Sequence, residues 1–284
     1  MKVLLASATR TFGKNFTLTM EGFLTQIEHL ANVFDDYKHQ GRPPQNPYRK
    51  IRQNFLQVLA YVMHEAIGTT PMCDYHHSLV TAMDADDAII SFNYDCAIDY
   101  VLKEFGSGKW NAAKGYGVSC ARRTCEHWNP EQPAGSNSLL LLKMHGSLNW
   151  HPYSNQSTQA RLKLKERWWP QHGNIRFEIV PPEWNKPTIR QGIYKAIWRK
   201  ARERLKGCEA IVFIGYSLPT TDLPVQALFR VDGKDAETLR LLTIVNPDPE
   251  ARKRIREVLR RRIGARTRVL VFDYFKDFHA FLSD

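Results

Sequence analysis

Polar residues that could carry out chemistry follow directly after four apolar runs in this 284-residue sequence. They are Asn93-Tyr94-Asp95, His145-Gly146-Ser147, Gly215-Tyr216-Ser217 and Asn246-Pro247-Asp248. Together these segments supply amides, carboxylates, an imidazole and hydroxyls, whereas a role in solubility alone would favour Lys and Glu. The imidazole of His145 can exchange a proton near neutral pH, because the unperturbed pKa of histidine is about 6.5. The pattern indicates one polar site assembled from several strand ends.

The apolar runs predict a parallel β-sheet. Five runs lack the alternation of a half-exposed strand, and such continuous runs are typical of strands buried on both faces of a parallel sheet. They cover residues 88–92, 138–144, 210–214, 241–245 and 269–272. Helical patterns lie between several of them, which favours right-handed crossovers in an open sheet. We therefore expect an α/β fold, with a doubly wound, mostly parallel Rossmann-like sheet and helical insertions.

The chain is expected to form a single domain over residues 1–284. Its parts are a mainly helical part at 1–86 and an α/β core at 87–284, with loop-rich insertions at 105–137 and 151–187 inside the core. The helical part shows two apolar patterns with helical spacing. One begins after Thr19, which suits a helix cap, and the other covers 51–67.

The polar segments lie where an open α/β sheet binds its ligands, beyond the carboxyl ends of the strands. Gly146 and Gly215 would let the backbone approach a phosphate or ribose closely, because glycine has no side chain. Ser147 and Ser217 offer hydroxyls in loops that can turn backbone N–H groups toward phosphate oxygens. Asn246 is suited to hold a ribose hydroxyl.

Structural roles compete with chemistry at several of these positions. Asp222 precedes a predicted helix and is first of all an N-cap candidate. Asn93 and Asp95 could simply organise a turn between a strand and a helix. A single histidine after a strand is more often structural than catalytic. Chemistry at His145 and Asn93 is favoured by their expected convergence on one edge of the sheet.

The net charge is +11 at pH 7, and most of the excess lies in one segment. Residues 249–268 contain nine Arg or Lys and only two Glu. The apolar residues of this segment have helical spacing, so we expect an amphipathic helix with a solvated basic face. A partner that carries phosphate or acidic side chains is the alternative. Nucleic acid bound by the basic helix at 249–268 is possible but not favoured.

The cysteines indicate a reducing compartment. Their five positions, 73, 96, 120, 125 and 208, do not have the even, regular spacing of a disulfide framework. Cys120, Cys125 and His127 lie close together, but zinc sites usually need a second ligand pair, so ordinary thiols are favoured and no metal is expected.

No run approaches the roughly 18 apolar residues of a membrane span. The first residues are too weak for a secretory signal, so we expect a cytoplasmic protein without membrane contact.

Five motifs, in order, resemble the motif set of bacterial sirtuin-like domains. They are Ser91-Phe92-Asn93-Tyr94-Asp95, Lys143-Met144-His145-Gly146-Ser147, Val180-Pro181-Pro182-Glu183-Trp184-Asn185-Lys186, Phe213-Ile214-Gly215-Tyr216-Ser217-Leu218-Pro219-Thr220-Thr221-Asp222 and Val245-Asn246-Pro247. The resemblance covers about residues 20–282. It implies a Rossmann-type domain with NAD as substrate. Similar domains in prokaryotic antiviral defence hydrolyse NAD to ADP-ribose and nicotinamide, and a homo-oligomer or a defence partner protein is a possible assembly.

The resemblance also implies roles for the site residues. Asn93 would lie at the nicotinamide ribose and position the attacking water, and His145 would be the base or a ribose contact. Asp95 would recognise the carboxamide of nicotinamide. The other NAD contacts would come from Gly146, Ser147, Gly215, Tyr216, Ser217, Asp222 and Asn246, with Gly215 and Ser217 at phosphate and Asn246 at the adenosine ribose. This cleavage needs orientation, a positioned nucleophile and charge complementarity, and no metal.

Two features of the family are missing from the sequence. Sirtuin-like domains open with a strand and a Gly-Ala-Gly loop that wraps the pyrophosphate. The favoured interpretation is that this chain starts after that loop, and the alternative is an eroded copy at residues 3–8. Deacylating sirtuins carry a four-cysteine zinc ribbon after the catalytic histidine, but only Cys208 lies between His145 and Gly215. We therefore expect cleavage of NAD rather than deacylation.

Two other classes of protein compete with an NAD hydrolase. A truncated or decayed sirtuin-like domain could serve as a non-catalytic nucleotide-binding or scaffold module, with residues 249–268 as its interaction surface. The weaker alternative is a serine hydrolase, because Gly215-Tyr216-Ser217-Leu218-Pro219 approaches a G-x-S-x-G nucleophile elbow and His279 follows later in the chain. Against it, Pro219 replaces the second glycine of that motif.

Overall fold

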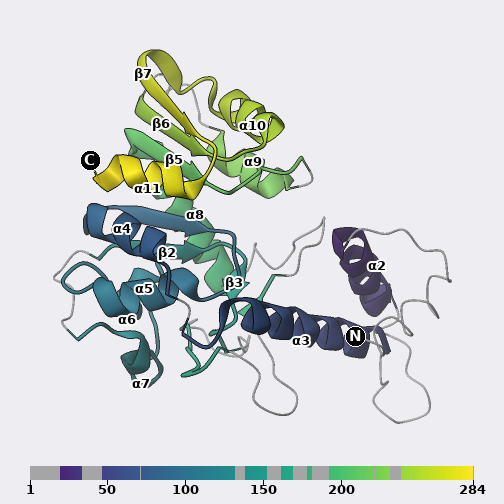
Figure 1. Ribbon diagram of the computed structural model, residues 1–284. Coiled ribbons are helices and arrows are strands. Elements are labelled where there is room, and N and C mark those ends of the chain that lie inside the picture. The colour runs from purple at the N-terminus through teal and green to yellow at the C-terminus, as the bar shows by residue number, and fades with distance from the viewer. Residues whose placement is uncertain are drawn as a thin grey trace, which may run out of the picture.

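Parallel strands form the core of the computed structural model (Figure 1). The structure describes residues 20–33, 47–70, 72–131, 138–151, 161–168, 178–180, 192–220, 222–230 and 238–283. Each of the five predicted strands is present, and helices separate most of them along the chain. The expected α/β, Rossmann-like fold class is therefore confirmed. Hydrogen bonding within the described residues divides the parallel strands into two sheets rather than one continuous sheet.

The larger sheet has three parallel strands in the order β5-β6-β7. These are β5 (Ala210–Ile214), β6 (Leu239–Val245) and β7 (Ile263–Phe272). The connecting helices, α9 (Leu223–Phe229) and α10 (Pro249–Leu259), contact each other. Two helices that cover the same part of a parallel sheet are what successive right-handed crossovers produce.

The smaller parallel sheet pairs β1 (Ala88–Ser91) with β2 (Leu140–Lys143). Beyond β2, β3 (Gly146–Ser147) pairs antiparallel with β4 (Glu178–Ile179). The connection from β1 to β2 contains α5 (Ala97–Phe105), α6 (Ala112–Gly115), α7 (Arg122–Cys125) and the 3₁₀ helix η1 (Glu126–Trp128). The segment at 105–137, which we expected to be rich in loops, thus contains short helices.

Three helices join the two sheets. α8 (Gly192–Gly207) leads into β5 and packs against β1 and β2. α4 (Asp74–Ala82) packs against α5 and against the last described helix, α11 (Phe275–Ser283), as Figure 1 shows. The last described helix, α11, is therefore held against the helix that precedes β1.

An arm of two helices extends away from the strands (Figure 1). α2 (Met20–Val33) and α3 (Pro47–Ile67) contact each other through a small apolar cluster of their own. Its buried members are Phe23, Leu24 and Ile27 of α2. Phe55 of α3 packs against both this cluster and the main core. The two helical patterns of the sequence therefore pair with each other.

The basic segment at 249–268 is not one helix: the predicted amphipathic helix is present at Pro249–Leu259, but its second part was wrong, because β7 begins at Ile263. α10 begins as its sequence indicates, because Oδ1 of Asp248 accepts a hydrogen bond from the backbone N–H of Glu250 at 2.9 Å. The helix ends at Leu259, and β7 begins at Ile263. Between them the buried guanidinium of Arg262 donates hydrogen bonds to the carbonyls of Leu205 and Cys208 at 2.7 and 2.6 Å. This anchoring to the end of α8 turns the chain out of the helix.

Candidate active site

The ends of β1 and β2 place an aromatic ring beside the imidazole of His145. The parallel register aligns Ser91 with Lys143, so the residues that follow both strands leave the sheet at the same edge. The ring centroids of Phe92 and His145 are 5.5 Å apart in an edge-on arrangement. His145 is only 7% exposed. Its imidazole is a buried polar group with an aromatic wall.

β5 reaches the same site from the other parallel sheet. The ring of Tyr216 stacks on Phe92, with the ring centroids 4.2 Å apart. The carbonyl of Tyr216 accepts a hydrogen bond from Nδ2 of Asn246 at 3.3 Å. Because Asn246 directly follows β6, this bond ties the end of β6 to the end of β5. The structure thus brings together the four strand ends that we expected to meet.

Asp222 lies next to His145 rather than capping a helix. Its Oδ2 is 3.8 Å from Nε2 of His145, and both side chains are almost entirely buried. Asp222 does occupy the N-cap position of α9, but its side chain makes no capping hydrogen bond. The predicted N-cap position is confirmed, but the side chain lies beside His145 and does not bond the helix. The segment before α9 includes Leu218 with a φ of 47°, an uncommon left-handed conformation for a non-glycine residue.

Backbone hydrogen bonds hold the chain around His145 in place. The carbonyl of His145 accepts from the N–H of Val180 at 2.8 Å. The carbonyl of Val180 in turn accepts from the hydroxyl of Tyr94 at 2.7 Å. On the other side, Nε1 of Trp198 in α8 donates to the carbonyl of Met144 at 3.0 Å. The position of the imidazole is therefore set by three separate segments of the chain.

Ser147 points into the protein. It is completely buried, and its hydroxyl donates to the carbonyl of Tyr94 at 3.3 Å and lies 3.6 Å from the sulfur of Cys96. Gly146, its neighbour, has a φ of 82°, in the left-handed region that favours glycine. The turn after β2 therefore directs His145 toward the site and Ser147 away from it.

The loop after β1 contains one exposed and one engaged polar residue. Asn93 is exposed, and its backbone N–H donates to Oγ of Ser91 at 3.3 Å. Asp95 is half-buried, and its Oδ1 accepts from the N–H of Ala97 at 2.9 Å. That bond supports the start of α5, because an Asp side chain before a helix commonly accepts a hydrogen bond from the first backbone N–H groups. The side chain of Asn93 is thus accessible, whereas the carboxylate of Asp95 already has a structural partner.

The loop after β5 is open at its surface. Gly215 is exposed, has a φ of 67°, and would have no atom within 4 Å of an added Cβ. Ser217 is also exposed, and its carbonyl accepts two hydrogen bonds from Arg254 of α10, at 3.1 and 3.0 Å. The left-handed conformation and the open space make Gly215 a point where a ligand can approach the backbone closely.

A buried ion pair between Lys143 and Asp99 supports the loop after β1. Nζ of Lys143 is 3.3 Å from Oδ2 of Asp99 and also donates to the carbonyl of Asp95. Oδ1 of Asp99 accepts from the hydroxyl of Tyr116 at 2.6 Å. Burial alone lowers the pKa of Lys143, but attraction to Asp99 and Asp95 outweighs it and raises the pKa above its ordinary value. Burial, followed by the charge of Asp99, raises the pKa of Tyr116 well above its usual range.

A model of the SIR2-like domain family matches residues 87–266, which is more than half of the chain. The chain belongs to the SIR2-like domain family. No curated protein matches the chain significantly. Family membership implies that this SIR2-like domain binds or uses NAD, and it confirms the resemblance seen in the sequence.

Two features of the described residues bear on ligand binding at this site. The backbone at Gly215 is open, and the stacked rings of Phe92 and Tyr216 form an apolar wall beside His145. Within the described residues, no three His, Cys, Asp or Glu side chains are placed to hold a metal ion.

None of the described helices has the length and apolar content to cross a membrane. Residues 3–8 and 181–186, which hold the alternative first loop and most of one motif, lie outside the described residues.

The serine-hydrolase arrangement receives little support from this geometry. A nucleophile elbow needs a helix that starts at the serine. Here α9 begins only at Leu223, after Ser217 and a loop. His279 lies on α11, where its ring packs 5.2 Å from that of Tyr75. The two groups that the hydrolase would need to pair therefore have other surroundings.

Sequence reasoning missed the aromatic residues of the site. Phe92 and Trp198 were not among the candidates, although the first borders His145 and the second holds the preceding carbonyl. Phe92 could have been found from its place between a strand and Asn93. Trp198 lies within a helical pattern more than 50 residues from Met144, and nothing local to it indicates the contact.

Proposed function

We propose that this SIR2-like domain hydrolyses NAD to ADP-ribose and nicotinamide, and that it does so in antiviral defence. The observation that carries the proposal is the buried pair of His145 and Asp222 beside the stacked rings of Phe92 and Tyr216. A buried imidazole next to a carboxylate is suited to take up a proton. The family supports NAD as the molecule that this site acts on.

The proposed reaction needs little from the protein beyond orientation and charge. The bond between C1′ of the nicotinamide ribose and the ring nitrogen breaks, and its electron pair stays on nicotinamide. The oxygen of a water molecule bonds to C1′, and His145 accepts the proton that this water loses. The carboxylate of Asp222 would stabilise the resulting imidazolium, and the exposed amide of Asn93 would orient the water.

The deciding experiment measures nicotinamide release from NAD by the purified chain. His145→Ala and Asn93→Ala are each expected to lower turnover by roughly 10²-fold or more, the usual contribution of a positioned acid or base. His127→Ala is the matched control, because His127 is exposed on η1 and should leave turnover unchanged. Turnover that persists in both site variants would show that the chemistry lies elsewhere. In infected cells, NAD loss with the wild-type chain but not with His145→Ala would support the defence role.

A non-catalytic nucleotide-binding or scaffold module is the second candidate, and three side chains favour the scaffold. Asp95, Ser147 and Asn246 are all held by internal hydrogen bonds rather than presented to a ligand. Calorimetry with NAD separates the two candidates. Binding without nicotinamide release would identify a nucleotide sensor, absence of binding would favour a scaffold, and turnover would identify the hydrolase.

A further inference from the structure

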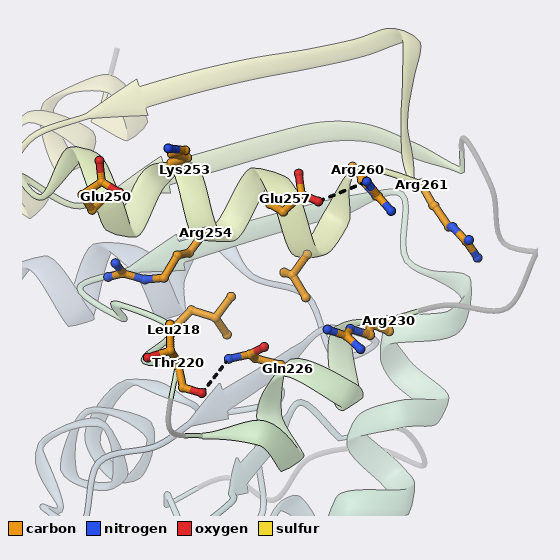
Figure 2. Close-up of a pocket in the computed structure, with 11 residues that line it drawn as sticks. Leu218, Thr220, Gln226, Arg230, Glu250, Lys253, Arg254, Glu257, Arg260 and Arg261 are labelled. Atoms are coloured by element: carbon orange, nitrogen blue, oxygen red, sulfur yellow. Dashed lines mark hydrogen bonds and ion pairs between the residues drawn. The ribbon is translucent and has the colours of Figure 1, made fainter.

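A groove lies between α10 and the segment that runs from Leu218 into α9, outside the site around His145 (Figure 2). Its volume is about 580 Å³. Figure 2 shows basic side chains along both sides of the groove, namely Arg230 from the end of α9 and Lys253, Arg254, Arg260 and Arg261 from α10 and the turn after it. Two carboxylates, Glu250 and Glu257, also line it, so positive charge dominates.

Not all of these cations are available to a ligand. Arg254 is engaged, because it donates to the carbonyl of Ser217 and lies 3.4 Å from Asp248. Arg260 pairs with Glu257 at 3.2 Å, but both side chains are about two-thirds exposed. Such surface pairs contribute little and exchange readily for another anion.

Three cations in the groove are free of such partners. Arg230, Lys253 and Arg261 are exposed, and none forms a hydrogen bond or ion pair with another residue in the described part of the chain. Basic residues also continue beyond the groove, with Arg256 on α10 and Arg266 on β7 exposed. The positive surface is therefore longer than the groove itself.

The chemistry of the groove favours phosphodiesters over a protein partner. The centre of a protein–protein interface is typically rich in aromatic residues and poor in charge. None of the described lining residues is aromatic, and five are basic. Interfaces with nucleic acid are much more positively charged than those with protein. Guanidinium groups also match phosphate oxygens in a bidentate geometry.

The same lining favours a duplex over a single strand. Proteins that hold single strands usually stack the bases on aromatic side chains, and this groove offers none among its described residues. A duplex presents its phosphates outward, where basic side chains can reach them without reading bases. We propose that the groove between α9 and α10 binds the backbone of duplex nucleic acid without sequence preference. This proposal does not depend on hydrolysis of NAD.

The test is binding of a fluorescein-labelled DNA duplex of about 20 base pairs, measured by anisotropy at increasing salt. Contacts from Arg230, Lys253, Arg260 and Arg261 would give a slope of log affinity against log salt of about −3.6, at roughly 0.9 for each phosphate. Affinity should then fall roughly 100-fold between 50 and 200 mM salt. Lys253→Glu/Arg261→Glu should weaken binding at least 10-fold and lower the slope by about half.

The matched control is Arg122→Glu/Arg123→Glu on α7, which makes the same change in net charge at a different place (Figure 1). A control that weakens binding as much as the groove variant would show only a net-charge effect and would overturn the proposal. Absence of duplex binding at low salt, or stronger binding of poly-glutamate than of the duplex, would also overturn it. The milder Lys253→Gln/Arg261→Gln variant is tested together with the Lys253→Glu/Arg261→Glu variant. Circular dichroism establishes that each variant is folded.

Discussion

The imidazole of His145 has three neighbours that each limit what it can do. Phe92 closes one side of it, the main chain of the site is held by Trp198, and the carboxylate of Asp222 lies 3.8 Å from its Nε2. Burial keeps water from weakening the attraction between the imidazole and the carboxylate. At the scale of single residues, the charge of Asp222 is therefore the feature to test.

Asp222→Asn is expected to lower nicotinamide release on the order of 10²-fold, if the proposed activity holds. An amide cannot balance the charge of an imidazolium at His145, although its shape is nearly the same. The thermal midpoint of the variant is measured beside its turnover, because Asp222 is buried next to His145 and its replacement can also lower stability. Asp248→Asn is the control, since Asp248 also starts a helix and Asn caps as well as Asp. Equal turnover by Asp222→Asn and the wild type would remove Asp222 from the mechanism.

A second prediction at this scale concerns Lys165, whose pKa burial lowers to about 8. The unfolded chain holds this proton up to an ordinary value near 10.5, so it binds more protons than the folded chain between pH 8 and 10.5. The free energy of unfolding should therefore rise with pH across that window. Below pH 8 the folded chain contains the charged ammonium of Lys165 in a buried place, which lowers its stability. Lys165→Met should raise the thermal midpoint at pH 7 by roughly 2–4 °C and should flatten the rise with pH.

The control for Lys165 is Lys163→Met, which changes an exposed lysine two residues away. Thermal melts of both variants at pH 7 and pH 10 provide the comparison. A gain in stability that is the same at both pH values would contradict the role given to burial of the charge.

At the scale of elements, one buried ion pair connects the loop after β1 to β2. Lys143 ends β2, and it reaches both Asp99 in α5 and the carbonyl of Asp95. The loop that carries Asn93 is thereby held against the strand that leads to His145. Together with the hydrogen bonds that Tyr94 makes to Ser147 and Val180, the ion pair helps to set the relative position of the two predicted catalytic residues.

Asp99→Asn should lower the free energy of unfolding by about 3 kcal/mol or more, because it leaves the buried charge of Lys143 without its counter-ion. The joint change Lys143→Met/Asp99→Leu should cost less, since it removes both charges. Unfolding in denaturant measures both. Glu203→Gln is the control for an exposed pair on α8 and should cost under about 1 kcal/mol. A double variant that is less stable than Asp99→Asn would contradict this account.

At the scale of the whole molecule, α2 is the described helix of the arm that is least connected to the core, because Leu56 and Ala60 of α3 are buried in the main core. Its apolar cluster consists of few residues, and Phe55 belongs to both this cluster and the edge of the main core. Small clusters of this kind open at a lower free energy than the core strands. α2 should therefore detach from α3 as a local unit while the two sheets stay intact.

Ile27→Ala should open the arm without unfolding the molecule. Ile27 is fully buried, and such a truncation costs about 2–5 kcal/mol, which is large for a small cluster. Hydrogen exchange is expected to become faster in α2 and part of α3, with protection of β6 unchanged. Val33→Ala, at an exposed position of the same helix, should change neither. Equal loss of protection in α2 and β6 would show that arm and core unfold together.

Much of the fold could be predicted because it rests on local patterns. The five strands follow continuous apolar runs, but burial on both faces was predicted correctly for β2 and wrongly for β5 and β7, which expose Val212 and Val271. The helix at 249–268 was the main error. Its apolar spacing continues past Leu259, but the contact of Arg262 with the end of α8, more than 50 residues away, outweighs that spacing.

The sequence by itself determined the class of fold, the family and the strand ends at which polar residues gather, since these depend on residue type and order along the chain. Only the tertiary structure decided the direction of each polar side chain. It turned Ser147 inward, gave Asp95 a place at the start of α5, and moved the carboxylate of Asp222 beside His145. The physical reason is that most buried polar groups need a hydrogen-bond partner, and many of those partners come from segments far apart in the sequence.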